Sequence, residues 1–246
     1  MRNLSLFSGV GGMDLGLEWA GMETVGQVEI DPTCRSVLAR HWPYVPRHDD
    51  VRTAIEWWEG LDQGNPDVVS GGFPCQPFSQ AGHKKGESDP RYLWPEFAEV
   101  LRHLRPRYAI VENVAHILKS PVFGQILADL AALGFDAEWG VLSACSVGAP
   151  HTRPRLFIVA YANGSDGSEG LADRHAREAA IWRAHNAQRW RSQSRVWIPA
   201  ARQPGRMVAG LAERMVKAGG NAVVPQAAQF IGKYVMELED ARNGIQ

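Results

Sequence analysis

The chain has 246 residues, of which 45% are hydrophobic, and its formal net charge at pH 7 is -1. A chain of this length can bury a sizeable core in one large or two small domains. The small net charge excludes wholesale coating of nucleic acid, so any contact with a polyanion must come from local clusters of basic residues.

Cys34, Cys75 and Cys145 are too few and too scattered for a disulfide framework or a zinc site, which is typical of a reducing compartment. The N-terminus leads into a strand without a signal-peptide pattern, and no apolar run of the sequence is long enough to span a bilayer. We therefore expect a cytoplasmic protein with no membrane partner and no bound metal.

The chain opens with a strand, a glycine turn and a helix. Residues 3–7 read as a first strand, residues 8–12 are rich in glycine, and residues 13–20 place Met13 and Leu17 on one helical face. Glycines at such a turn let backbone amides and a helix N-terminus approach a ligand, as in nucleotide-binding loops. An ordinary tight turn is the alternative.

A second strand over residues 24–28 ends at Glu29. A carboxylate at this position can accept hydrogen bonds from ribose hydroxyls, and Ile30 could pack on an adenine face. Glu29 could equally be a solvated strand end. For Asp31 we favour a structural role, as the N-cap of a helix over residues 33–41.

A third short strand near Val45 precedes Asp49 and Asp50. Without further information, these aspartates read as a cap for a helix over residues 51–60. A ligand contact by Asp50 competes with that interpretation.

The run Gly71-Gly72-Phe73-Pro74-Cys75-Gln76-Pro77-Phe78-Ser79 follows a predicted buried parallel strand over residues 67–70. Cys75 therefore lies at the carboxyl edge of a sheet, where open α/β sheets bind ligands. Pro74 and Pro77 fix φ on either side of the thiol and hold it on a stiff turn. This context favours a nucleophile over a buried structural cysteine.

A polar segment over residues 80–92 contains Lys84, Lys85 and Arg91. It suits a lid that closes over a charged polymer, although an ordinary solvated loop is the alternative. A helix over residues 93–104 and a buried strand over residues 108–111 follow. That strand is expected to bring Glu112 to the same edge as Cys75.

An amphipathic helix over residues 123–133 is expected to end at Gly134, and strands follow over residues 137–142 and 156–160. Arg153 and Arg155 alternate on what we predict to be an extended segment, so both can point to one face. They would form a clamp for a phosphate or a carbonyl, or else a solvated edge.

Composition changes at residues 163–170, which read as a linker. Beyond it lies a basic segment with Arg174, Arg177, Arg183, Arg189, Arg191, Arg195, Arg202 and Arg206, interleaved with Trp182, Trp190 and Trp197. Arginine and tryptophan suit phosphate contacts and stacking on bases, whereas a solvated surface helix is the alternative. Two helices, over residues 207–216 and 225–238, are predicted to close the chain.

Five short motifs occur in the order in which they stand in cytosine-C5 DNA methyltransferases. They are Phe7-Ser8-Gly9-Val10-Gly11-Gly12, Phe73-Pro74-Cys75-Gln76 with Phe78-Ser79, Glu112-Asn113-Val114, Gly148-Ala149-Pro150-His151-Thr152-Arg153-Pro154-Arg155 and Gly220-Asn221-Ala222-Val223-Val224-Pro225-Gln226. They resemble, in turn, the family's S-adenosylmethionine loop, cysteine motif, glutamate motif, arginine motif and closing motif. Together they span nearly the whole chain.

The resemblance implies a Rossmann-like α/β sheet with helices on both faces and a small basic recognition region. It implies a catalytic domain at residues 1–162, a recognition region at 163–206, and a C-terminal part at 207–246 that packs back on the first helix. The implied activity is methyl transfer from S-adenosylmethionine to C5 of a cytosine flipped out of double-stranded DNA, in a bacterial or phage-type setting. A restriction enzyme is a possible companion in the same system.

The resemblance also implies roles for individual residues. Cys75, preceded by Pro74, would attack C6 of the base, and Glu112 would protonate or hydrogen-bond N3. Asn113 would brace the backbone, Arg155 with Arg153 behind it would bind the base carbonyl or phosphates, and Ser79 and Gln76 would hold the flipped nucleotide. The implied cofactor contacts are Phe7, Ser8, Gly9, Gly11, Gly12, Glu29, Ile30, Asp50, Val51, Pro74, Asn221 and Ala222.

The chain departs from the family in size. Family members usually carry a substantial recognition domain between the arginine and closing motifs, whereas here only residues 161–219 separate them. A short recognition site, relaxed specificity, or dependence on a partner or dimer would follow. Alternative functions are a catalytically weak DNA-binding protein that needs a partner, and an RNA cytosine-C5 methyltransferase.

Overall fold

The computed structural model describes residues 1–74, 92–149, 151–162 and 222–244. Its elements are, in chain order, β1 (Arg2–Leu6), α1 (Gly12–Trp19), β2 (Glu23–Val28), α2 (Pro32–His41), β3 (Arg47–His48), the 3-10 helix η1 (Val51–Thr53), α3 (Ala54–Gly60), β4 (Val68–Gly71), α4 (Trp94–Leu104), β5 (Tyr108–Val114), η4 (Ala115–Lys119), α5 (Pro121–Ala132), β6 (Phe135–Ser143), η5 (Ala144–Val147), β7 (Pro154–Ala162) and α8 (Pro225–Arg242).

The strands form one seven-stranded sheet in the order β3-β2-β1-β4-β5-β7-β6. Neighbours from β3 to β5 are parallel, whereas β7 lies antiparallel between β5 and β6. The chain runs outward from β1 to β3 and then returns to the other side of β1 through β4. The carboxyl ends of β1 and β4 therefore meet at a topological switch point, where open α/β sheets bind ligands.

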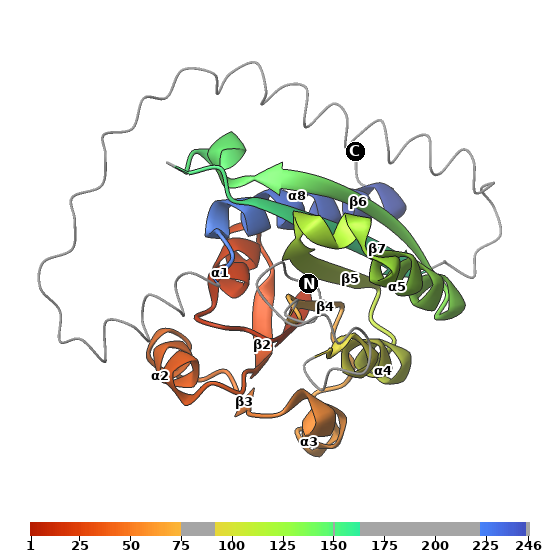
Figure 1. Ribbon diagram of the computed structural model, residues 1–246. Coiled ribbons are helices and arrows are strands. Elements are labelled where there is room, and N and C mark those ends of the chain that lie inside the picture. Colours follow the sequence, from red (N-terminus) through yellow and green to blue (C-terminus); the bar gives the residue numbers. More distant parts are fainter. Residues whose placement is uncertain (75–91, 150, 163–221, 245–246) are drawn as a thin grey trace, which may run out of the picture.

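Helices cover both faces of the sheet, which confirms the predicted fold class (Figure 1). On one face, α1 and α8 pack over a cluster that includes Leu17, Tyr108 and Tyr234. On the other face, α3, α4 and α5 share a core with Trp58, Phe97 and Ile126 as representatives. Each face is closed by its own apolar core, so the two layers fix the sheet between them.

The last helix lies directly on the first, as expected. A Cβ atom built on Gly16 of α1 would lie 2.2 Å from the carbonyl oxygen of Pro225 and 2.5 Å from Cβ of Ala228. A close approach of this kind is possible only because Gly16 has no side chain. The start of α8 is thereby placed beside the start of α1.

Several element boundaries differ from the sequence-based expectations. β5 continues through Val114, and β6 and β7 extend at both ends beyond the predicted ranges because their antiparallel ladder continues past the apolar runs. The expected extended backbone at Arg153 is wrong, since its φ is 29° and only the residues from Pro154 onward belong to β7. The third strand lies at Arg47–His48, just after the predicted position.

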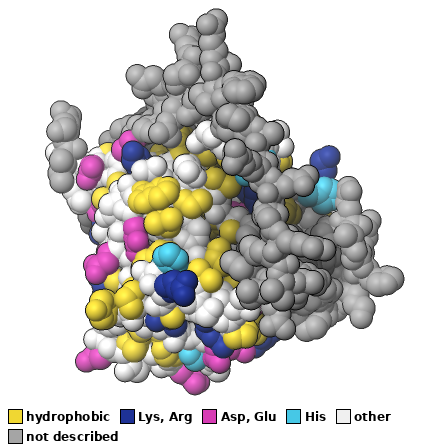
Figure 2. Space-filling view, turned by 90° about the vertical axis from the view of Figure 1, so that its left-hand side faces the viewer, with side chains coloured by type: hydrophobic (Ala, Val, Ile, Leu, Met, Phe, Trp, Pro, Cys, Tyr) yellow, Lys and Arg dark blue, Asp and Glu magenta, His cyan; other side chains and the backbone are white. Residues whose placement is uncertain are grey.

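Among the described residues, no helix combines the length and the apolar character needed to cross a bilayer. The face seen from the side of α1 and α2 carries acidic, basic and hydrophobic side chains in alternation (Figure 2). Charge of a single sign does not dominate the described residues there. A uniformly basic surface, such as nucleic-acid coating would need, is therefore not formed by this face.

Candidate functional site

A pocket lies at the switch point, where β1 and β4 end. Its lining combines backbone of the glycine loop with one carboxylate and two residues of the closing motif; the lining residues are Ser5, Leu6, Phe7, Ser8, Gly9, Met13, Gly71, Gly72, Glu112, Ala222 and Val223. The structure thus brings together parts of three of the five sequence motifs, and the two glycines that precede the cysteine motif, in one place.

The glycine loop leads from β1 into α1 through left-handed backbone. Phe7 and Gly9 have φ of 54° and 57°, and Gly11, the N-cap residue, has φ of 83°. A Cβ atom at Gly11 would lie 2.4 Å from the indole of Trp42, so this position requires glycine for space as well as for conformation. The strained loop exposes a helix N-terminus to the pocket, which is the arrangement that favours a polar or anionic ligand group.

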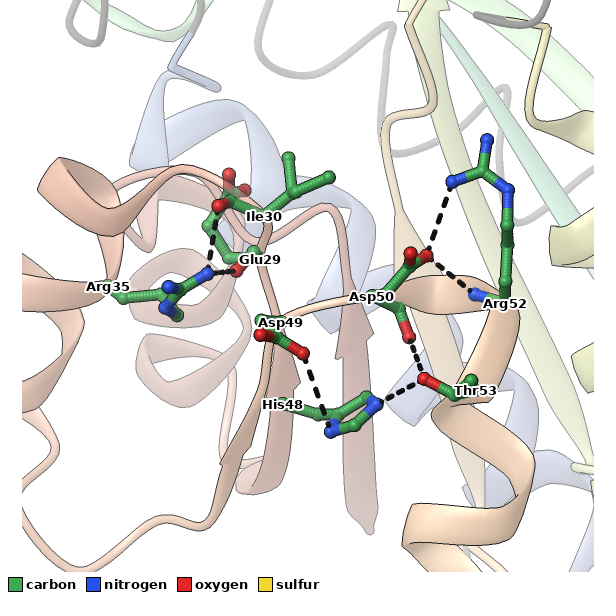
Figure 3. A network of polar contacts seen from close by, with 8 residues as sticks. All are labelled: Glu29, Ile30, Arg35, His48, Asp49, Asp50, Arg52 and Thr53. Carbon is green, nitrogen blue, oxygen red and sulfur yellow. Dashed lines mark hydrogen bonds and ion pairs between the residues drawn. The ribbon is translucent and has the colours of Figure 1, made fainter.

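Glu29 ties the end of β2 to this loop. Its Oε2 accepts a hydrogen bond from the Gly9 amide at 2.7 Å, and its Oε1 accepts one from the Asp31 amide at 2.8 Å. Arg35 supports the same turn by donating to the carbonyl oxygens of Glu29 and Ile30 (Figure 3). Glu29 is therefore held by its neighbours and is not a free, solvated strand end.

Ile30 is 67% exposed although it is apolar. Figure 3 shows its side chain directed away from the Arg35 contacts. An exposed, branched apolar side chain beside a ligand loop offers a surface on which a flat ring can pack. Asp31 accepts hydrogen bonds from the amides of Thr33 and Cys34, which confirms that it caps α2.

Asp50 follows β3 and caps η1. Its carboxylate accepts a hydrogen bond from the Arg52 amide at 3.0 Å and lies 3.4 Å from the Arg52 guanidinium (Figure 3). Thr53 joins the Asp50 carbonyl to His48. The capping interpretation of Asp50 is confirmed. Asp50 and the buried Val51 are not among the residues that line the switch-point pocket. They follow β3, which lies two strands away from β1 in the same sheet.

Glu112 is the carboxylate of the pocket. It is only 8% exposed, and its Oε1 lies 2.9 Å from Nε of Arg155. Burial raises the pKa of Glu112 from its ordinary value of 4.5 to about 7, although the charges of Arg155 and Arg153 act in the opposite direction. A carboxyl group with such a pKa can hold a proton near neutral pH and donate it.

The segment that leads to Cys75 is fixed beside Glu112. Asn113 donates from Nδ2 to the carbonyl oxygen of Phe73 at 3.2 Å, and its Oδ1 accepts from the Val114 amide. A Cβ atom at Gly72 would lie 2.6 Å from Oε2 of Glu112. Pro74 is the last residue before a stretch that the structure does not describe, so Cys75, Gln76 and Ser79 lie outside the described residues, as does Asn221.

Arg153 does not share the contact of Arg155. Its NH2 group donates to the carbonyl oxygen of Ala222 at 3.0 Å, whereas Arg155 binds Glu112. Burial and the neighbouring Arg155 lower the pKa of Arg153, while Glu112 raises it. The two arginines therefore lie near one carboxylate but serve different contacts.

Sequence reasoning missed two residues that support the glycine loop. Asp14 of α1 is fully buried, and burial raises its pKa from 3.8 to about 7, with Ser5 and Gln27 facing it. Trp42 packs against Gly11 and donates from Nε1 to Glu18 at 2.6 Å. The only signal for Asp14 was its place between Met13 and Leu17 on an otherwise apolar helix face.

Comparison with known proteins matches residues 1–195 to the C-5 cytosine-specific DNA methylase family. The chain is 34% identical over 166 residues to Type II methyltransferase M.NgoMIV of Neisseria gonorrhoeae, covering 65% of this chain and 52% of that protein. It is 36% identical over 173 residues to Type II methyltransferase M.AquIA of Picosynechococcus, covering 63% and 70% respectively. The matched region thus spans about half the length of the first relative and more of the second.

Solved structures give the same picture. S. pombe Dnmt2 methyltransferase superposes with a TM-score of 0.56 at 25% identity, over 72% of this chain and 55% of that one. A prophage-encoded DNA modification methyltransferase from E. coli gives 0.57 at 27% identity, over 66% and 47%. Similarity of sheet and similarity of sequence therefore lead to the same family.

Proposed function

Because this chain belongs to the C-5 cytosine-specific DNA methylase family, we propose that it transfers a methyl group from S-adenosylmethionine to C5 of cytosine in duplex DNA. The observation that supports this most is the buried Glu112, with a pKa of about 7, paired with Arg155 beside the segment that leads to Cys75. A proton donor, a cation and a cysteine motif at one sheet edge are what this chemistry requires.

Cys75 is the proposed nucleophile. C5 of cytosine is a poor nucleophile, and a bond from a thiolate to C6 raises the electron density at C5. Once C5 has formed its bond to the transferred methyl group, loss of the C5 proton to a base expels the thiolate from C6 and restores the aromatic ring. Pro74 and Pro77 would keep the thiol on a stiff turn throughout these steps.

Glu112 is the proposed acid. Charge that develops on the ring during thiolate addition is relieved when N3 takes a proton or a strong hydrogen bond, and a carboxyl group with a pKa near the working pH is suited to that transfer. Nε of Arg155 would orient the carboxylate. Its Nη1 also donates to the carbonyl oxygen of Pro154 at 2.9 Å, so we assign the remaining N–H groups to the base carbonyl. Gln76 and Ser79 would hold the flipped nucleotide.

The cofactor fits the glycine loop and its surroundings. Gly9, Gly11 and Gly12 with Phe7 and Ser8 would hold its amino-acid part, since Phe7, Ser8 and Gly9 line the pocket beside the N-terminus of α1. Glu29, Ile30, Asp50 and Val51 would hold its nucleoside, and Pro74, Asn221 and Ala222 would close the pocket. When bound, S-adenosylmethionine supplies the electrophilic methyl group that becomes attached to C5.

The base must leave the stack before Cys75 can reach C6, at a cost of about a few kcal/mol. The basic segment from Arg174 to Arg206 would contact the phosphates of the duplex. A restriction enzyme with the same target is a companion consistent with the Type II relatives, and RNA is the competing substrate.

The test is transfer of labelled methyl from S-adenosylmethionine to unmethylated duplex DNA by wild type and Cys75→Ala, followed by conversion sequencing of the product. Label on cytosine that is absent with Cys75→Ala is the expected result. A folded wild type that binds the cofactor but labels only RNA would redirect the proposal to RNA. Trapping on 5-fluorocytosine DNA separates an enzyme from a catalytically weak binder, because only completed transfer leaves a stable adduct.

A further inference from the structure

Arg153 lies where the two halves of the site meet. Its NH2 group donates to the carbonyl oxygen of Ala222 at 3.0 Å, across 69 positions of the sequence. From the sequence we expected Arg153 to act with Arg155 as a clamp on a phosphate or on the base carbonyl. In the structure, its described hydrogen bond goes instead to the segment that begins α8.

The backbone explains why Arg153 and Arg155 make different contacts. Arg153 has φ of 29°, whereas β7 begins at the next residue and pairs Arg155 with Val114 of β5. A non-glycine residue in this region costs about 1–3 kcal/mol and persists only where its surroundings hold it. The bond to Ala222 is one such restraint.

The segment held by Arg153 is also a wall of the proposed cofactor pocket. Ala222 and Val223 line that pocket together with Gly9 and Glu112. The carbonyl oxygen of Val223 lies so close to the first residue of α1 that a Cβ atom at Gly12 would be 2.2 Å from it. A shift of Ala222 therefore changes the space between the closing motif and the glycine loop.

The positive charge of Arg153 also acts on Glu112, the proposed acid of the site. Its charge and that of Arg155 both act on Glu112, and the two arginines repel each other. A single side chain thus connects the carboxylate of the acid pocket to the wall of the cofactor pocket.

We propose that Arg153 is a positioning residue that holds the Ala222 wall of the cofactor pocket in place from the side of the site that carries Glu112 and Arg155. The inference rests on the proposed function and names a residue that sets cofactor affinity without belonging to the pocket lining.

The test compares Arg153→Met with Arg155→Met, which remove the same charge from the neighbourhood of Glu112 but only one of which breaks the bond to Ala222. The affinity of each full-length variant for S-adenosylmethionine is measured by calorimetry without nucleic acid. We expect about a tenfold loss for Arg153→Met, the size of a lost hydrogen bond from a charged donor, and less than about a twofold change for Arg155→Met.

Arg153→Lys serves as the rescue variant, because lysine keeps the charge and one donor. It should recover part of the lost affinity, and thermal unfolding shows whether each variant is folded; if Arg153→Met does not fold, Arg153→Lys is compared with Arg155→Lys instead, and a partial loss of affinity is expected at position 153 only. Unchanged affinity in Arg153→Met, or equal losses in both methionine variants, would overturn the inference and leave the proposed function intact. A folded wild type that does not bind S-adenosylmethionine would overturn both.

Discussion

Nε of Arg155 lies 2.9 Å from Oε1 of Glu112, and the two residues come from neighbouring antiparallel strands. Arg155 pairs with Val114, two positions beyond Glu112, so the pair is a diagonal cross-strand neighbour on one face of the sheet. The pairing of β5 with β7 therefore places Arg155 near Glu112, and the long arginine side chain spans the remaining distance. A rigid sheet positions the acid more accurately than a loop would.

This contact predicts the pH dependence of methyl transfer. Because burial raises the pKa of Glu112 to about 7, the carboxyl group is protonated below that pH and loses its proton above it. An acid that must donate fails once it is ionised, so the transfer rate should fall as pH rises through about 7. Single-turnover rates across pH 5 to 9, with the enzyme saturated with cofactor, would measure this.

Glu112→Gln removes the titrating group and should lower the rate by about 10²- to 10⁴-fold, the usual contribution of general acid catalysis. The remaining activity should no longer fall above pH 7. If the alkaline fall persisted unchanged in Glu112→Gln, another group would be responsible for it.

A second prediction concerns Glu29, whose two carboxylate oxygens accept from the amides of Gly9 and Asp31. Glu29→Gln replaces one accepting oxygen with a donor, so one of these amides loses its partner and the glycine loop loosens. We expect S-adenosylmethionine to bind about tenfold more weakly, in line with a lost bond to a charged acceptor.

Glu23→Gln is the matched control, because Glu23 begins the same strand on the surface and lies at its opposite end. Its affinity for the cofactor should equal that of wild type. Equal affinities for all three proteins, measured by calorimetry, would remove Glu29 from the cofactor site.

A third prediction concerns Asp14, which is buried below the glycine loop. Its pKa is raised from 3.8 to about 7, so between these values the folded protein binds more protons than the unfolded chain. The stability from this group is thus complete below pH 3.8 and is lost as pH rises through 7. Asp14→Asn cannot ionise, so it should stabilise the protein at pH 8 by on the order of 3 kcal/mol and have little effect near pH 4.

Urea unfolding at both pH values measures this difference. Asp240→Asn, at an exposed position of α8, should change stability by less than about 0.5 kcal/mol at either pH. An Asp14→Asn variant that is less stable than wild type at pH 8 would show that the ionised carboxylate is well solvated or paired.

Much of the fold could be predicted because local signals agree with it. The apolar runs before Gly71 and Glu112 are short and end in polar or glycine residues, as buried parallel strands do, and Asp31 before Pro32 marks a helix start. The glycine loop, Gly71 with Gly72, and Glu112 lie at the ends of parallel strands, so strand order alone brings them to one edge.

The remaining features depend on contacts between distant residues. The left-handed backbone of Arg153 and its bond to Ala222 have no local cause in the sequence, and the two arginines look equivalent there. Burial of Asp14 depends on α1 packing on β1 and β2, where Ser5 and Gln27 face it, and the support of Gly11 by Trp42 depends on how α2 returns. Such tertiary effects override local propensity.

The last prediction tests the packing of α8 on α1, which places the closing motif at the pocket. Gly16→Ala would drive a methyl group against the backbone of Pro225 and Gln229, at 2.2 and 2.8 Å, and backbone atoms cannot move aside singly. The helices must separate, so the free energy of unfolding should fall by about 1–3 kcal/mol.

Gly124→Ala is the matched control, since it lies within α5 with nothing within 4 Å of the added Cβ, and alanine is the better helix former. That variant should be more stable than wild type by about 0.5–1 kcal/mol. Changes of opposite sign in the free energy of unfolding, measured in urea, would verify the contact between α8 and α1. Because α8 carries the Ala222 wall with it, cofactor affinity should fall in Gly16→Ala alone. A Gly16→Ala variant as stable as Gly124→Ala would mean that α8 does not rest on α1.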